Sequence, residues 1–251
     1  MKDYLASEYA PILKRHGLAT FQALWNVQLT AVDEPNAENG GWSSVCRLEL
    51  EGQGFFLKRQ TNYFTRTLHH PLGEPTVARE FRNIMRYRRL GIPSLQAAYY
   101  GEYSAGGDHR AVLLTRALDD WSSLFEFLEG WGERQTDEKQ AIVDACARLI
   151  GRLHAAGLRH GCLYPKHLFL QLRDGQWQGC LIDLEKTRQL WWGWRDQVRD
   201  LESFLRTVGV WSATEQRAFV TNYLAEGHFP GSPDLWLQRM ARRCKHKEAR
   251  H

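Results

Sequence analysis

Histidine, lysine and carboxylate side chains gather in one short stretch of the chain, between apolar segments. The stretch begins with His160-Gly161-Cys162-Leu163-Tyr164-Pro165-Lys166-His167 and leads to Leu181-Ile182-Asp183-Leu184. Between them Asp174-Gly175 separates two apolar runs, which predicts a tight hairpin. Asp183 interrupts the second run, and a carboxylate in such an apolar setting needs a partner. The stretch therefore predicts a polar loop followed by a carboxylate presented at the end of a strand.

The residues that precede this stretch predict an antiparallel sheet with one main helix. Period-two alternation and short apolar runs indicate strands at about 21–30, 42–51, 55–58, 99–103 and 111–116. The main helix opens at Pro75-Thr76 and ends before Gly91 and Pro93. A shorter helix is expected at about 4–16, where Gly17 would end it.

Helical patterns dominate after residue 118. One helix is expected to begin at Asp137 and to end at Gly157, and two more at about 195–209 and 214–227. We therefore expect an α+β protein of two lobes, with the sheet lobe at 1–118 and the helical lobe at 119–251.

This order of elements allows each part of a phosphotransferase of the protein-kinase type to be sought in turn. Such enzymes use a strand lysine, held by a helix glutamate, to neutralise the α and β phosphates of ATP. Lys58 and Glu80 are candidates for that pair. The turn with Gly40, Gly41, Ser43 and Ser44 lies where a loop covers the nucleotide phosphates, because glycine lets backbone N–H groups approach an anion.

Asp183 occupies the place of the magnesium-binding aspartate in this scheme. Asp200 lies on a predicted helix 17 residues later and is expected to brace the loop rather than to take part in the chemistry. Cys162 and His160 stand in the loop that would be catalytic, and a cysteine–histidine nucleophile is the less favoured reading of them, since nothing indicates an oxyanion hole.

Several motifs together resemble the InaA branch of the lipopolysaccharide kinase family. They are Gly40 to Val45, Phe56-Leu57-Lys58-Arg59-Gln60, His70-Pro71 to Pro75-Thr76, Arg79-Glu80-Phe81, Ile92-Pro93, the 160–167 loop and Ile182-Asp183-Leu184-Glu185-Lys186, over about residues 20–225. The resemblance implies a protein-kinase-like fold, ATP and Mg²⁺ as cofactors, and phosphorylation of a heptose or Kdo hydroxyl in the lipopolysaccharide inner core. It implies Asp183 and His167 as metal ligands and the core glycolipid as partner.

The chain departs from the family pattern in its loop. Active heptose kinases of the family resemble His-Arg-Asp-Cys there, whereas this chain has His160-Gly161-Cys162-Leu163. A thiol is mostly neutral at pH 7, so Cys162 is a poor substitute for a carboxylate base. Two alternatives therefore stay open: a pseudokinase-like scaffold or regulator in envelope stress, and a kinase for another small hydroxyl compound.

Composition and charge indicate a soluble cytoplasmic protein. No apolar run is long enough to span a bilayer, and residues 1–20 contain charges but no apolar signal core. The five cysteines include no CxxC pair, which favours reduced thiols. The net charge of +4 comes from the end of the chain, where six lysines and arginines from Arg239 onward stand against Glu248.

This basic tail could contact the inner membrane peripherally or be a solvated terminus, and a nucleic-acid partner is not expected. Three of the ten tryptophans lie just after Asp183, in Trp191-Trp192-Gly193-Trp194. Packing inside the helical lobe is the slightly favoured reading of this cluster. Stacking on sugars and contact with a membrane are the alternatives.

Overall fold

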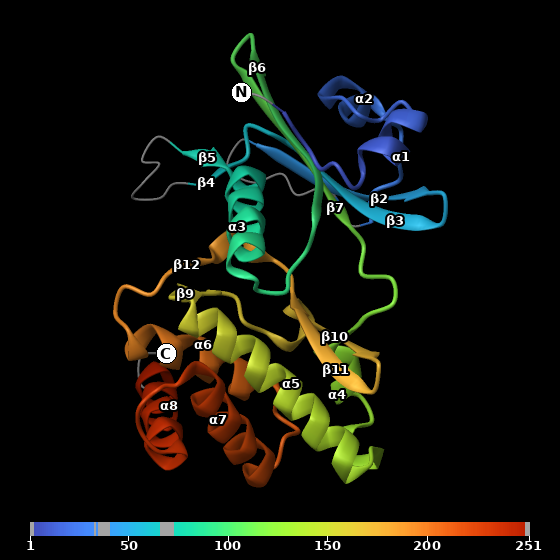
Figure 1. The fold of residues 1–251 in the computed structure, drawn as a ribbon. Coiled ribbons are helices and arrows are strands. Elements are labelled where there is room, and N and C mark those ends of the chain that lie inside the picture. The colour runs from blue at the N-terminus through green and yellow to red at the C-terminus, as the bar shows by residue number, and fades with distance from the viewer. Residues whose placement is uncertain (1–2, 33, 35–40, 66–72, 249–251) are drawn as a thin grey trace. The chain divides into compact units, whose positions relative to one another are not determined.

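The computed structural model describes residues 3–32, 34, 41–65 and 73–248, without the side chains of 245–248. Gly40 and His70-Pro71 lie outside the described residues, as does Arg250 of the tail. The chain folds into two units, Met1–Arg86 with Leu95–Asp119 and Tyr87–Ser94 with Asp120–His251 (Figure 1). The short segment 87–94 thus groups with the second unit rather than with the predicted sheet lobe.

The first unit is built on a five-stranded antiparallel sheet with strand order β1-β6-β7-β3-β2. Its strands are β1 (Tyr4–Leu5), β2 (Trp42–Leu50), β3 (Gln53–Thr61), β6 (Ala97–Ala105) and β7 (Asp108–Arg116). The helices are α1 (Ala10–Arg15), α2 (Phe21–Asn26) and α3 (Thr76–Leu90), and β4 (Phe64–Thr65) pairs with β5 (Glu74–Pro75). The sheet has five strands, as predicted, and the unit has three helices, whereas one main helix and one shorter helix were predicted.

The prediction of a strand at 21–30 is wrong, because this segment begins with α2. The hydroxyl of Thr20 caps the helix by accepting from the Ala23 N–H. Phe21, Leu24 and Trp25 follow helical spacing, and they pack against the core of the unit. The fifth strand is instead β1, which pairs with β6 and lies inside the segment that was predicted as a helix at 4–16. Only α1 remains of that helix.

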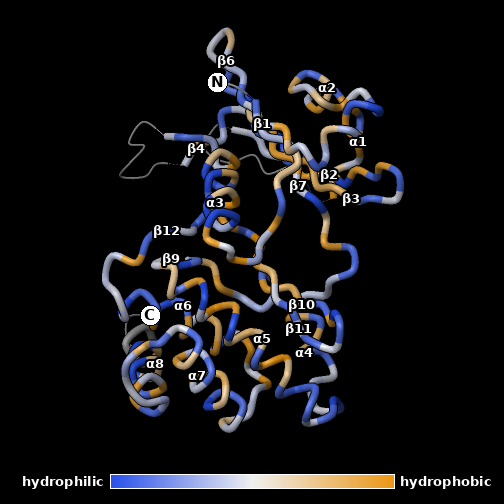
Figure 2. The backbone as a smooth tube through the Cα atoms, viewed as in Figure 1, coloured by the Kyte–Doolittle hydropathy of each residue, from blue (hydrophilic) through white to orange (hydrophobic). Residues whose placement is uncertain are grey.

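The two faces of the sheet have different neighbours. Leu48 and Leu50 of β2 and Leu57 of β3 point to one face, where they form a core with residues of α1 and α2. Because side chains alternate along a strand, Lys58 and its neighbours at every second position point to the other face, where α3 lies. Both hydrophobic and hydrophilic residues occur along β2 and β3 (Figure 2).

The second unit is mostly helical and contains two small sheets. Its helices are α4 (Leu124–Leu128), α5 (Thr136–Ala155), α6 (Trp194–Thr207), α7 (Ala213–Gly227) and α8 (Pro233–Glu248). The strands are β8 (Ser122–Ser123), β10 (Leu168–Arg173) and β11 (Gln176–Leu181) in one sheet and β9 (Leu158–Arg159) and β12 (Arg188–Gln189) in another. Short 3₁₀ turns occupy η1 (Trp131–Glu133), η2 (Pro165–His167) and η3 (Leu184–Lys186).

The buried helix α5 organises this unit. It buries Ile142, Cys146 and Leu153 completely, and α7 and β11 pack against it. Asp137 and Glu138 lie in its first turn, where they favour the helix dipole, so this helix is confirmed with those at 195–209 and 214–227. The hairpin at Asp174-Gly175 is confirmed between β10 and β11. Helix α8 was not predicted, because its many arginines weaken the apolar pattern. The α+β fold class is confirmed.

Candidate active site

The lysine–glutamate pair expected from the sequence is formed in the first unit. Lys58 lies in the middle of β3 rather than at its end, and its Nζ donates to both carboxylate oxygens of Glu80 at 2.7 Å. The Glu80 side chain is 4% exposed and the Lys58 side chain 26% exposed. A two-oxygen contact of this kind holds the ammonium in one place while part of it stays accessible to an anion.

Gln60, which the sequence analysis did not single out, fixes the start of the helix that carries Glu80. Its amide nitrogen donates to Ser43 Oγ at 3.2 Å and to Thr76 Oγ1 at 2.5 Å, and its oxygen accepts from Val77 N at 3.1 Å. One side chain thus ties β2 and β3 to the first turn of α3. Its position two residues after Lys58, on the same face of the strand, is the signal that could have identified it.

Neighbouring side chains of the predicted phosphate loop point to opposite faces of the sheet, because side chains alternate along a strand. Ser43 points to the face that carries the lysine–glutamate pair, whereas Ser44 points to the opposite face and is 4% exposed. The Ser44 hydroxyl therefore cannot share a ligand with that pair, and it has no hydrogen-bond partner among the described residues. Gly41 is needed for packing, because a Cβ there would lie 2.5 Å from the Asn62 carbonyl oxygen. Gly40 lies outside the described residues.

In the second unit, Asp200 of α6 holds the loop that begins at His160. Its carboxylate accepts from the backbone N–H groups of His160 at 2.7 Å and Gly161 at 3.1 Å, and from Arg159 Nε at 3.0 Å. Burial opposes ionisation of this carboxyl, but the hydrogen bond and charge of His154 and the charge of Arg159 outweigh it and lower its pKa to about 2. The expectation that Asp200 braces the loop is confirmed.

His160 positions the loop through its ring. The ring is fully buried, its Nε2–H donates to the Ile182 carbonyl oxygen at 2.9 Å, and its Nδ1 accepts from the Cys162 N–H at 3.3 Å. Burial also lowers the pKa of His160, which favours the neutral ring. Because the backbone engages both nitrogens, His160 links the loop to the residue before Asp183 and has no free nitrogen for proton transfer.

Cys162 is a protected thiol rather than a ready base. It is 6% exposed. Burial and then the charge of Asp183 raise the pKa of Cys162, against a hydrogen bond and the charge of Lys186. The thiol is therefore neutral near pH 7. Lys186 was not predicted. It can approach the loop because residue 161 is a glycine: Gly161 has φ +85°, and a Cβ there would lie 2.7 Å from the Lys186 carbonyl oxygen.

His167 and Asp183 face each other across the loop. The Nδ1–H of His167 donates to the Cys162 carbonyl oxygen at 2.7 Å, which leaves Nε2 directed at Asp183 Oδ2, 3.4 Å away. Asp183 has left-handed backbone angles, φ 57° and ψ 57°, and its side chain is 32% exposed. Such angles are uncommon for residues other than glycine and often mark functional positions.

The side chains of Asp183 and His167 suit a divalent ion that is also coordinated by the phosphates of a nucleotide. Among the described residues, no three His, Cys, Asp or Glu side chains are arranged to hold a metal by themselves. Mg²⁺ commonly uses one or two carboxylates together with substrate phosphates, which fits the accessible Asp183 oxygen. His167 Nε2 adds a nitrogen ligand, a type that transition metals prefer.

Asp196, which the sequence analysis also missed, fixes the segment that follows. Its side chain is fully buried, and three arginines surround its carboxylate, at 2.7, 3.4 and 3.6 Å. They are Arg188, Arg199 and Arg159, respectively. Burial opposes its ionisation, but hydrogen bonds from Arg188 and the backbone lower the pKa of Asp196. An Asp two residues after a tryptophan cluster carries no distinctive sequence signal.

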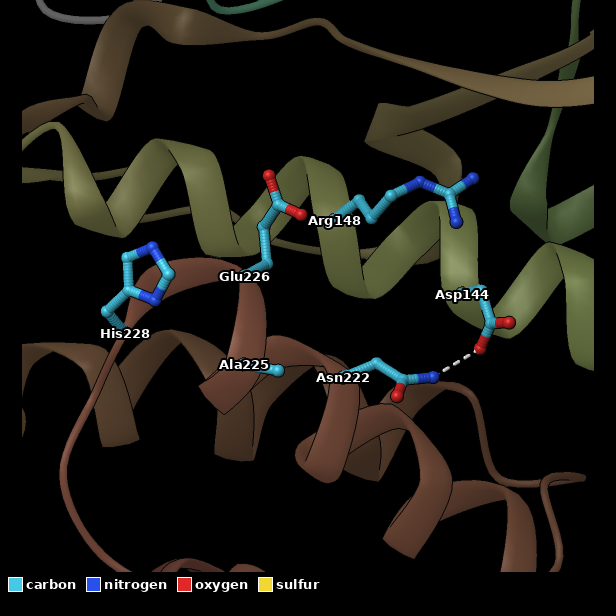
Figure 3. A pocket seen from close by; sticks show the side chains of 6 residues that line it. All are labelled: Asp144, Arg148, Asn222, Ala225, Glu226 and His228. Atoms are coloured by element: carbon cyan, nitrogen blue, oxygen red, sulfur yellow. Dashed lines mark hydrogen bonds between the residues drawn. The ribbon is translucent and has the colours of Figure 1, made fainter.

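A surface pocket of about 520 Å³ lies elsewhere in the second unit, between α5 and α7. Figure 3 shows Asp144 and Arg148 from α5 facing Asn222 and Glu226 from α7. Asn222 donates to Asp144, and Glu226 accepts from Arg152 at 2.8 Å, so these carboxylates are already engaged. The pocket contains none of the predicted site residues.

The fold and these two sets of residues define the class as a two-lobed, protein-kinase-like α+β protein. A solved structure of WaaP in complex with acyl carrier protein matches with a TM-score of 0.72 and 22% identity, over 98% of this chain and 99% of that one. The chain belongs to the lipopolysaccharide kinase (Kdo/WaaP) family, whose model matches residues 22–223. The resemblance found in the sequence motifs is thereby confirmed.

Two curated relatives belong in the same comparison. The chain is 28% identical over 171 residues to protein InaA of Escherichia coli K12, covering 67% of this chain and 79% of InaA. It is 28% identical over 145 residues to the lipopolysaccharide core heptose(I) kinase WaaP of Pseudomonas aeruginosa, covering 50% of each chain. The chain thus spans about half the length of that heptose kinase.

Proposed function

We propose that this protein is an ATP-dependent kinase that phosphorylates a heptose or Kdo hydroxyl of the lipopolysaccharide inner core. The observation that carries the proposal is the contact of Lys58 with both oxygens of the buried Glu80. A protein kinase needs this pair in place before it can hold ATP phosphates. Family membership and the named activity of the heptose kinase relatives support the choice of acceptor.

Each residue has a stated part in this proposal. Lys58 neutralises the α and β phosphates, Glu80 keeps it in position, and the turn at 40–43 covers the phosphates with backbone N–H groups. Asp183 and His167 hold Mg²⁺, which supplies charge neutralisation for the transferring phosphoryl group. His160 and Asp200 keep the loop in the conformation that places these ligands.

The acceptor glycolipid gives the protein its place in the cell. We assign it to the cytoplasm, with peripheral contact at the cytoplasmic face of the inner membrane through the basic tail. None of the helices in the described part of the chain is both long and apolar enough to cross a bilayer.

The test of this proposal uses purified protein, labelled ATP, Mg²⁺ and dephosphorylated core glycolipid. Lys58→Met should abolish ATP binding and transfer, because it removes the cation that neutralises the phosphates. Asp183→Ala should abolish transfer, because it removes the carboxylate that would hold Mg²⁺. The exposed Lys14→Met serves as the control and should behave as wild type. Full transfer by Lys58→Met would overturn the phosphate assignment.

A second candidate function is a nucleotide-binding scaffold that transfers no phosphate. The buried, neutral thiol of Cys162 favours it, because a general base is missing from the loop. In both readings Lys58 binds nucleotide, so ATP binding alone does not separate them.

Cys162→Asp separates these two functions. Lys186 lies beside this position and would stabilise the new carboxylate. In a kinase we expect transfer to rise by about 10²-fold, the usual size of a general-base contribution. Cys162→Ser, which adds no acid, is the matched control. Transfer that stays at zero in Cys162→Asp, with ATP still bound, would establish the scaffold.

A further inference from the structure

Three tryptophans are exposed on one short turn of the second unit. Trp191, Trp192 and Trp194 have 50%, 60% and 43% of their surface accessible to solvent. This corrects the slightly favoured expectation that the cluster is packed inside the helical lobe. Large aromatic side chains on a surface commonly mark a place of contact with another molecule.

The backbone of this turn is held in a fixed shape by a buried carboxylate. The buried carboxylate of Asp196 accepts from the backbone N–H groups of Trp191 at 3.0 Å and Trp192 at 3.2 Å. The same carboxylate is bonded to Arg188 at 2.7 Å, which anchors the turn to β12. The exposed rings are therefore presented by an ordered backbone, and little conformational entropy is lost when they bind.

Arginines lie against the exposed rings. Arg188 lies over Trp191 at 4.8 Å, measured from the guanidinium carbon to the ring centroid. Arg195 and Arg239 both lie over Trp194, at 5.3 and 4.3 Å. Arg239 comes from α8, where it begins the basic tail. These tryptophans and arginines come from β12, the turn, the start of α6 and α8, and we call them the Trp–Arg surface.

We propose that the Trp–Arg surface docks the protein on an anionic phospholipid bilayer. Tryptophan is enriched where protein meets the membrane interface, and arginine is attracted to anionic headgroups. The inference deepens the peripheral contact and rests on the proposed function for its cellular location. It adds the apolar element that the basic tail lacks, since stable attachment to a bilayer combines buried apolar area with charge.

The chemistry of the surface favours a bilayer over a carbohydrate. A sugar hydroxyl both donates and accepts hydrogen bonds, so a sugar platform uses acceptors as well as donors beside the rings. The nearby carboxylate is that of Asp196, and it is fully buried and engaged by arginines and backbone N–H groups. Arg195 and Arg239 place guanidinium groups beside Trp194, and guanidinium groups donate hydrogen bonds and suit phosphate oxygens.

The test is co-sedimentation of the full chain, without ATP, with vesicles of phosphatidylcholine alone or mixed with phosphatidylglycerol. The wild type should bind the vesicles that contain phosphatidylglycerol and should not bind the vesicles of phosphatidylcholine alone. Trp191→Ser with Trp192→Ser should weaken this binding by about tenfold or more, because both interfacial rings are lost. Arg195→Gln with Arg239→Gln should weaken it by a similar factor and make the remaining binding less sensitive to salt, because fewer cations face the headgroups.

Matched controls come from exposed residues elsewhere in the unit. Phe125 and Leu172 are both 56% exposed, so Phe125→Ser with Leu172→Ser removes comparable apolar surface. Arg173→Gln removes an exposed cation from β10. Both controls should bind vesicles as wild type does, and circular dichroism establishes that every variant is folded.

Three results would overturn the proposal. The first is no binding of the wild type to mixed vesicles, and the second is equal losses in the tryptophan variant and its control. The third is unchanged vesicle binding by the tryptophan variant with loss of binding to lipid-free core oligosaccharide, which would identify a sugar platform. Because vesicle binding is measured without ATP or acceptor, its failure leaves the kinase proposal untouched, and inactivity of the kinase leaves this one untouched.

Discussion

At the scale of single residues, Asp200 combines burial with charge. Its carboxylate holds the backbone at His160 and Gly161 and an arginine side chain. An unfolded aspartate has a pKa of about 3.9, whereas that of Asp200 is lowered to about 2. The folded state therefore binds this proton less readily than the unfolded state. The resulting stability is present above about pH 4 and is lost as the pH falls towards about 2.

We expect this linkage to be visible in urea unfolding. Between about pH 5 and pH 2, the wild type should lose on the order of 2 kcal/mol more than Asp200→Asn, which has no titrating group at this position. Asp200→Asn should be the less stable protein at neutral pH. The exposed turn variant Asp174→Asn is the control and should follow the wild type. If the free energy of unfolding changed with pH by the same amount in the wild type and in Asp200→Asn, the lowered pKa of Asp200 would be contradicted.

The residues that were predicted from the sequence are those whose chemistry stands out locally. Lys58 and Glu80 meet as expected, and so do His167 and Asp183. Gln60, Lys186 and Asp196 were missed, because their partners lie on segments that are brought close only by folding. Ser44 was grouped with Ser43 because they are adjacent, yet adjacency in a strand places them on opposite faces.

At the scale of elements, the segment from β12 to the start of α6 depends on one buried carboxylate. Asp196 binds three arginines and the backbone of the tryptophan turn. Removing one partner from a buried ion pair leaves the other charges unpaired, at a cost of about 3–5 kcal/mol.

The elements predicted correctly, such as α5, have long periodic patterns. The short apolar run at 21–26 fits strand and helix alike, and packing against the core decides it.

Asp196→Asn should release this turn. We expect hydrogen exchange of the Trp191 and Trp192 amides to accelerate, because each loses a charged acceptor. Asp234→Asn, at an exposed position on α8, is the control and should leave these amides protected. Unchanged protection in Asp196→Asn would show that something other than this carboxylate orders the turn.

At the scale of the whole molecule, each unit carries its own buried thiols. Cys46 lies in the sheet unit, and Cys146, Cys162 and Cys180 lie in the helical unit. Cys244 is partly exposed, and none of the five forms a disulfide. Burial raises the pKa of Cys180 to about 12 and that of Cys146 further still. Protonated, buried thiols react slowly with disulfide reagents.

Thiol labelling should therefore report on the two units separately. In the native protein, Ellman's reagent should label Cys244 in a fast phase, and Cys244→Ser should remove that phase. As urea increases, labelling of Cys46 should follow the opening of the sheet unit, and labelling of Cys146 that of the helical unit. A fast phase that persists in Cys244→Ser would mean that a thiol described as buried is accessible.

Gly161 also limits which substitutions the loop can accept. At position 162 a carboxylate is a single substitution away, with a lysine beside it to accept the charge. At position 161 the path is closed: the backbone has φ +85°, and a Cβ would collide with the Lys186 carbonyl oxygen. An arginine at this position would therefore require a differently shaped loop. Conversion to the His-Arg-Asp pattern is open at position 162 and is blocked at position 161 unless the backbone near Lys186 moves.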